Sequence, residues 1–193
     1  MSTPVSVYAE MTPNPSAMKF VANRMLVKGS YEFFDRNAAA VSPLAHQLFD
    51  FSCVSQVFIS QNFVTIIKTK DTDWDDVMTI LREFIQSYLN SGEIIMTEDN
   101  PSAAPSKVHT EIDPSRLSDI ELQITDVIEE YIRPAIQMDG GAIEFRSFEN
   151  GVVFVKLRGA CSGCPSSTVT LKAGIENLLK RMVPEVQEVV SEI

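Results

Sequence analysis

The chain has 193 residues, 45% of them hydrophobic and 22% charged, a balance that predicts a folded protein with one large or two small cores. The formal net charge of −10 argues against nucleic-acid binding, which needs clustered lysine and arginine. No segment approaches the roughly 18 consecutive apolar residues of a membrane span, and three cysteines are too few for a disulfide scaffold.

The cellular location is predicted from the cysteines and from the start of the chain. The first twenty residues contain Glu10, no arginine and no long apolar stretch, so they match neither a secretory signal nor an arginine-rich transit peptide. Few cysteines also fit a reducing compartment. We therefore expect a soluble, cytosolic protein, although a mature organellar protein without its presequence fits the same features.

Residues 1–91 combine strand and helix patterns. Alternating apolar residues predict strands at 5–9, 18–22, 54–60 and 63–69. Helical spacing predicts a short helix over 41–49 and a longer one from 73 to about 89. Ser42 and Asp73 are suited to cap these helices, with Pro43 at a first helical position. The pattern predicts a small α+β domain, and nothing in it resembles an active site.

Residues 92–115 are expected to link two domains, because they turn polar and contain Pro101, Pro105 and Pro114. The charge changes along the chain as well. Residues 1–91 carry seven Lys and Arg against nine Asp and Glu, whereas residues 92–193 carry nine against seventeen. The acidity therefore belongs to the linker and the second domain.

Residues 116–193 predict a second α+β domain with the order helix, hairpin, helix, strand. Ser118 is suited to cap the first helix, which Pro134 ends or kinks. Its expected apolar stripe is Ile120, Ile124, Val127, Ile128 and Tyr131. A hairpin is expected at 142–148 and 152–157, and a last strand at 186–190. The helix that begins at Pro165 is expected to have an apolar, buried face formed by Leu171, Ile175, Leu178, Leu179 and Met182.

The candidate site is the pair Cys161 and Cys164 in the run GACSGCP, where a strand pattern gives way to a helix pattern. With Pro165 as the first helical residue, Cys164 stands at the N-cap and Cys161 just before it. The positive end of the helix dipole favours thiolates there. We expect this corner to be exposed.

The residues alone leave three functions open for this pair. A thiol–disulfide oxidoreductase fits the strand–CxxC–helix order, but Ala160 stands where such sites usually carry an aromatic residue. A zinc site needs four ligands, and His46, Cys53 and His109 lie in the other domain or the linker. An iron–sulfur cluster shared by two chains would have four thiolates.

The run from Met138 to Gly141 and the run GACSGCPSSTVTL from Gly159 to Leu171 closely resemble the C-terminal domain of the Nfu iron–sulfur scaffold family. The run from Met11 to Phe20 resembles the Nfu N-terminal domain. This resemblance implies a non-enzymatic carrier and identifies Cys161 and Cys164 as ligands.

The cofactor and partners follow from the same resemblance. Two protomers would share one 4Fe–4S cluster as a homodimer, take it from an upstream donor and transfer it to apo-proteins. A thiol–disulfide oxidoreductase is the alternative.

Overall fold

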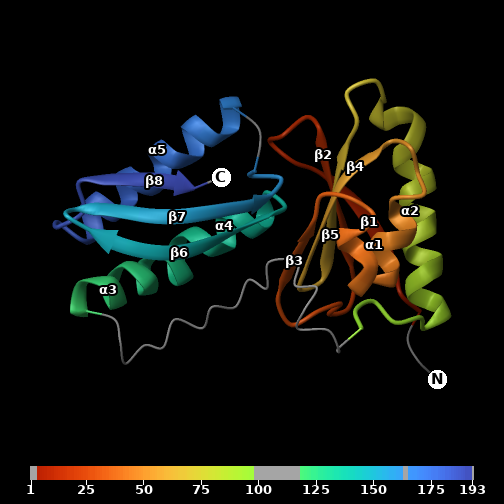
Figure 1. The fold of residues 1–193 in the computed structure, drawn as a ribbon, viewed down its shortest axis with the longest axis horizontal. Helices are drawn as coiled ribbons and strands as arrows, with labels where there is room; N and C mark the ends of the chain where they lie inside the picture. The colour runs from red at the N-terminus through yellow and green to blue at the C-terminus, as the bar shows by residue number, and fades with distance from the viewer. Residues whose placement is uncertain (1–3, 98–117, 163–164, 193) are drawn as a thin grey trace. The chain divides into compact units, whose positions relative to one another are not determined.

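The computed structural model describes residues 4–97, 118–162 and 165–192, and the chain divides into two compact units, Met1–Val108 and His109–Ile193. Both units are α+β, as the sequence predicts, and each is described below by itself (Figure 1). The predicted domain boundaries at 91/92 and 115/116 stay a prediction. Among the described residues, no helix is long and apolar enough to cross a membrane.

The described part of unit 1 is a five-stranded antiparallel sheet with helices against one face (Figure 1). The strand order is β1-β2-β5-β4-β3. The strands are β1 (Val7–Met11), β2 (Ala17–Ala22), β3 (Ser30–Phe33), β4 (Val54–Ser60) and β5 (Phe63–Lys68). The helical segments are η1 (Ala38–Val41), α1 (Pro43–Leu48) and α2 (Trp74–Ser91).

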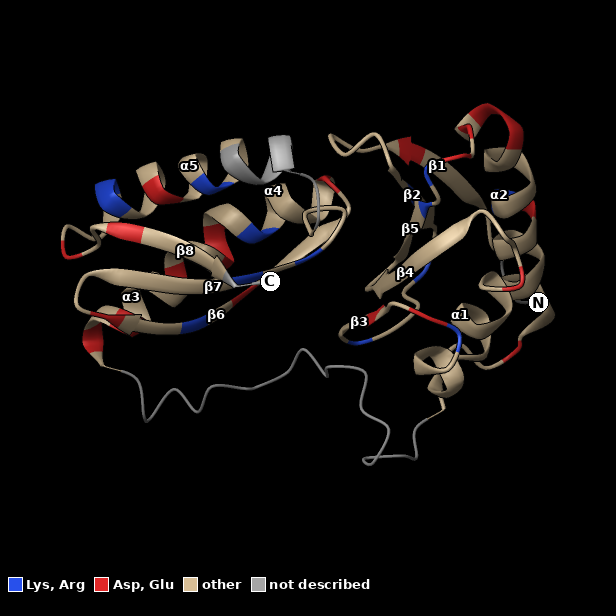
Figure 2. Ribbon diagram, turned by 45° about the horizontal axis from the view of Figure 1, so that its top comes forward, with Lys and Arg blue, Asp and Glu red and all other residues tan. Residues whose placement is uncertain are grey.

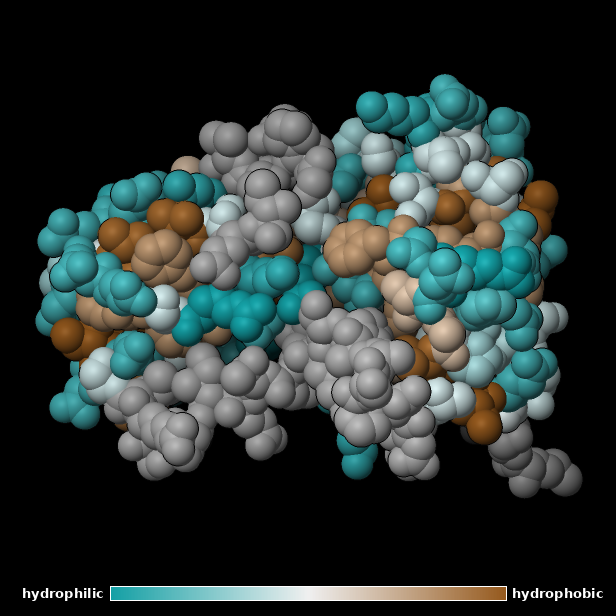
Figure 3. Space-filling view, viewed as in Figure 1, coloured by the Kyte–Doolittle hydropathy of each residue, from teal (hydrophilic) through white to brown (hydrophobic). Residues whose placement is uncertain are grey.

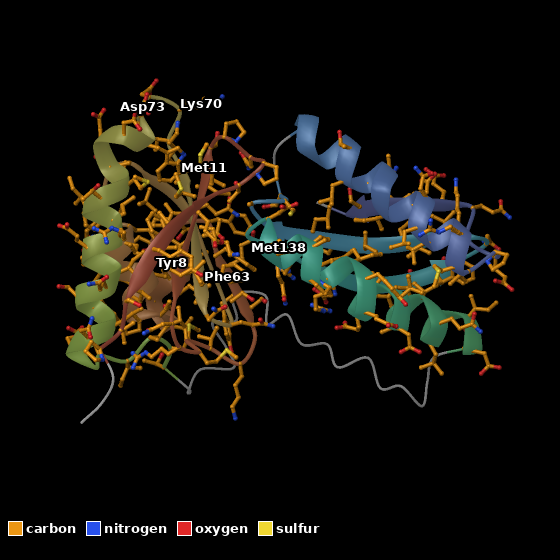
Figure 4. The ribbon with its side chains drawn as sticks, turned by 180° about the vertical axis from the view of Figure 1, so that it is seen from behind. Tyr8, Met11, Phe63, Lys70, Asp73 and Met138 are labelled. Carbon is orange, nitrogen blue, oxygen red and sulfur yellow. The ribbon has the colours of Figure 1, made fainter. Side chains whose placement is uncertain are left out.

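The local signals in unit 1 predict most of these elements. The Ser42 side chain accepts a hydrogen bond from the backbone of Ala45 and caps α1, with Pro43 first in the helix. Asp73, at the start of α2 in Figure 4, caps that helix in the same way through the N–H of Asp75. The hairpin of β4 and β5 turns at Gln61, which has a positive φ. Strand β3 is an addition that the sequence patterns did not predict.

Unit 2 has a three-stranded sheet with the order β6-β7-β8, in which β6 and β7 are antiparallel and β8 runs parallel to β7. A broken helix precedes the sheet: α3 (Asp119–Val127), a π-helical turn η3 (Ile128–Ile132) and α4 (Arg133–Met138). The remaining elements are β6 (Gly141–Glu149), β7 (Val152–Gly159), α5 (Pro165–Met182) and β8 (Glu188–Glu192). The predicted order of helix, hairpin, helix and strand is confirmed.

The core of unit 2 lies between one face of this sheet and its helices. Helices α3, α4 and α5 cover that face, with Ile124, Ile136 and Leu179 fully buried against the strands (Figure 1). The hairpin closes at Asn150 and Gly151, both with positive φ, the conformation for which this dipeptide is favoured. Apolar atoms also gather on the opposite, uncovered face of the sheet (Figure 3).

The helix starts of unit 2 are confirmed, but two predicted buried positions are wrong. Ser118 and Glu121 form a reciprocal capping box at the start of α3. Tyr131 was expected in the apolar stripe and is 48% exposed, because the π-helical turn changes the helical phase after Ile128. Met182, expected on the buried face of α5, is exposed at the last turn of that helix.

Candidate functional site

The cysteine loop begins where β7 ends. Gly159 has a φ of +65°, a left-handed conformation that glycine adopts without strain, and it turns the chain out of the strand. The N–H of Ala160 then donates to the carbonyl of Gly140 across a distance of 3.2 Å, which ties the loop to the turn before β6. The backbone and the hydroxyl of Ser162 both donate to the carbonyl of Gly159. Together these bonds hold Cys161 at the end of the hairpin.

Cys161 lies in the core of unit 2, with 5% of its surface exposed. Its sulfur occupies space that the glycine at position 141 leaves open. A Cβ atom on Gly141 would lie 2.6 Å from Sγ of Cys161 and 2.7 Å from the carbonyl oxygen of Arg158, closer than real Cβ contacts. Gly141 is also the direct β-sheet partner of Gly159. The absence of a side chain at position 141 therefore leaves the space that the thiol of Cys161 occupies.

The expectation of an exposed thiolate at Cys161 is wrong in this structure. Burial raises the pKa of the Cys161 thiol to about 12, and the negative charge of Asp139 contributes in the same direction. The helix dipole does not compensate for this, because moving the thiolate out of water costs more than a nearby partial charge returns. Cys161 is therefore held as a neutral thiol.

The second cysteine of the pair lies outside the described residues. Helix α5 begins at Pro165, as predicted, so Cys164 immediately precedes a helix start. Within residues 4–97, 118–162 and 165–192, no three His, Cys, Asp or Glu side chains gather as ligands for a metal ion. Cys53 lies in the core of unit 1, as expected of a small hydrophobic residue. The Nε2 atom of His46 accepts a hydrogen bond from Nε of Arg36 at 3.2 Å.

An ion-paired cluster lies beside the cysteine loop. Arg158, three residues before Cys161, is buried and contacts Glu144 at 3.2 Å. Arg146 binds the other oxygen of the same carboxylate at 2.9 Å. The sequence patterns do not predict a role for these three residues. These charged residues alternate with apolar residues along two paired strands, and this pattern could have identified them in the sequence.

Alkylation provides a direct check on the burial of Cys161. In the cluster-free folded protein at about pH 8, we expect iodoacetamide to modify Cys161 about a hundredfold or more slowly than in the urea-unfolded chain. The reason is that a raised pKa lowers the thiolate fraction at every pH below it, and burial blocks the reagent. Peptide mass spectrometry resolves Cys161 from the other cysteines. Equal rates in the folded and unfolded chain would contradict the buried position.

Two family models and several relatives match this chain. Residues 124–190 match the family model described as a NifU-like domain, and residues 7–92 match the model for the N-terminal domain of the scaffold protein Nfu/NifU. A NifU-like protein of Schizosaccharomyces pombe is 39% identical over 189 residues, which cover 95% of this chain and 71% of that protein. The mitochondrial NFU1 iron-sulfur cluster scaffold homolog of Homo sapiens is 35% identical over 185 residues, covering 95% and 70%.

The two family matches identify the class of protein as a non-enzymatic carrier of iron–sulfur clusters. The chain belongs to the Nfu/NifU family of iron–sulfur cluster scaffold proteins. Members of this family bind iron–sulfur clusters and transfer them to client apo-proteins.

Proposed function

We propose that this protein carries one 4Fe–4S cluster between two copies of the chain, with Cys161 and Cys164 of each copy as its ligands. The cluster is cargo, received from an upstream donor and passed on to apo-proteins. The observation that carries the proposal is the placement of Cys161 between the end of β7 and the start of α5, in the domain that matches the NifU-like family model.

The number of thiolates supports the shared site. A 4Fe–4S cluster is held by four cysteine thiolates, and the CxxC loop of one chain contributes two. Cys53 belongs to the core of the other unit and is not needed. A second copy supplies the remaining two ligands with the same geometry, which a two-fold arrangement provides.

The buried position of Cys161 adds a condition for loading. The sulfur has to leave its place beside Gly141 before it can reach an iron atom, and the thiol has to lose its proton. Metal coordination removes the proton, because a thiol that coordinates a metal is deprotonated outright. In the cluster-free state the same burial protects the thiol from oxidants. The cytosolic location expected from the first twenty residues stays a prediction.

Cluster transfer tests this function. The loaded protein is mixed anaerobically with a purified apo-protein whose activity requires a 4Fe–4S cluster, in the presence of an iron chelator. We expect activity to return at a rate that the chelator does not change, because the cluster passes directly by ligand exchange. Restoration that the chelator abolishes would mean that iron and sulfide are released into solution, which contradicts a carrier.

A further inference from the structure

The last strand of unit 2 forms an edge of its sheet. Among the described residues, β8 has one neighbouring strand, β7. The N–H of Glu188 donates to the carbonyl of Gly151, which immediately precedes β7. Because successive N–H groups of a strand point to opposite edges, the N–H of Val189 points away from β7. Backbone groups on such an edge can pair with a strand of another chain, so an unprotected edge favours association.

A carboxylate from α5 occupies this edge. Oε2 of Glu176 accepts a hydrogen bond from the N–H of Val189 across 3.1 Å. Oε1 of the same carboxylate binds Nζ of Lys180, one turn later in the helix, at 2.6 Å. Charged residues of both signs follow one another along α5, which lies beside β8 (Figure 2). Lys172, one turn before Glu176, contacts Glu188 on β8 at 3.7 Å.

The ionisation of Glu176 favours this contact. The hydrogen bond from Lys180, and after it the hydrogen bond from the N–H of Val189, lower the pKa of the Glu176 carboxyl group. The carboxylate is therefore charged at neutral pH. An ionised acceptor forms a stronger hydrogen bond with a backbone N–H than a neutral acceptor does. A strand added at the edge of β8 would first have to displace this carboxylate from Val189.

The same arrangement recurs at an edge of unit 1. Strand β1 is an end strand of that sheet, and side chains from α2 reach its start. Oε1 of Gln86 accepts the N–H of Val7 at 3.2 Å, and the amide of Asn90 bonds both backbone groups of Val5. The second edge strand of unit 2, β6, has a bulge after Phe145. Bulges and side chains that cover edge groups both protect sheets from strand addition.

We propose that Glu176 blocks the β8 edge against strand addition by a second copy of the chain. A second copy is the relevant partner, because identical edges can pair antiparallel about a two-fold axis. The inference concerns the cluster-free chain and does not depend on the proposed cluster. Together with the proposed function, it would make the association of two chains depend on the cluster.

The test compares two substitutions of the same residue in the reduced, metal-free protein. Glu176→Ala removes the acceptor of the Val189 N–H, whereas Glu176→Gln loses the same charge but keeps an acceptor oxygen. Alanine and glutamine both favour helices, so α5 should form in each variant. We expect amide exchange of Val189, followed by NMR, to be about tenfold faster in Glu176→Ala than in the wild-type chain. The association constant from sedimentation equilibrium should also rise about tenfold, the effect of one charge-assisted hydrogen bond. Glu176→Gln should stay close to the wild-type chain in both measurements.

Four results would overturn the proposal. Unchanged exchange of Val189 in Glu176→Ala would mean that the carboxylate does not protect this N–H. Faster exchange without stronger association would mean that the carboxylate does not limit strand addition. Equal association of the two variants would assign the effect to charge and not to the hydrogen bond. Association that leaves the β8 amides unprotected would place the contact elsewhere. Unchanged exchange of the β6 and β7 peptides verifies that unit 2 stays folded.

Discussion

Replacing Cys161 or Cys164 with alanine is expected to reduce the iron retained after anaerobic reconstitution from about two atoms per chain to background. Each substitution removes two of the four thiolates of the shared cluster, because both protomers carry the change. The remaining pair cannot satisfy the four iron atoms. Iron and acid-labile sulfide are counted after gel filtration, together with the visible absorption of the protein.

Cys53→Ala is the matched control for this prediction. Cys53 is buried like Cys161, but it lies in the core of unit 1. Its loss should therefore leave the iron content of the protein unchanged. A double variant, Cys161→Ala with Cys164→Ala, that still retains a full cluster would show that other residues are the ligands.

Gly141→Ala is expected to destabilise unit 2 by about 1–3 kcal/mol, the usual cost of an additional atom in a close-packed site. The new methyl group would meet Sγ of Cys161 at 2.6 Å and the backbone oxygen of Arg158 at 2.7 Å. A side chain can rotate away, but the paired strand cannot easily move. Hydrogen exchange of β6 and β7 peptides in the cluster-free protein measures the stability of unit 2 separately from that of unit 1. We expect these peptides to exchange about fivefold or more faster in the variant than in the wild-type chain.

Gly174→Ala in α5 is the control for the same chemical change. A Cβ on Gly174 meets no atom within 4 Å, so alanine there should be neutral or should stabilise the helix by up to about 1 kcal/mol. The displaced sulfur gives a second measurement, because Gly141→Ala should also make Cys161 easier to alkylate. Unchanged hydrogen exchange in the Gly141 variant would mean that the thiol does not occupy the space beside this glycine.

Local chemistry was sufficient to predict most of the fold. Ser42, Asp73 and Ser118 each have a side chain that accepts backbone N–H groups at a helix start, and each caps the helix predicted from it. The Asn150-Gly151 dipeptide likewise closes the predicted hairpin, because both residues adopt positive φ. These signals act within a few residues of the chain, so they can be recognised from the sequence alone.

The features that the sequence did not predict depend on distant contacts. The strand β3 exists through its pairing with β4, about 25 residues later in the chain. The phase of the helix after Ile128 changes because the core selects Ile132 and Ile136 over the regular 3.6-residue period. The burial of Cys161 likewise depends on Gly141, which β-sheet pairing brings beside the loop.

Native mass spectrometry of the anaerobically reconstituted protein, with iron and acid-labile sulfide counted on the same sample, tests whether two chains share one cluster. We predict a species of two chains carrying one cluster of four iron and four sulfide, with a broad visible absorption that oxygen bleaches. A colourless single chain with a reversible Cys161–Cys164 disulfide would contradict it and would identify thiol–disulfide exchange as the chemistry of this loop.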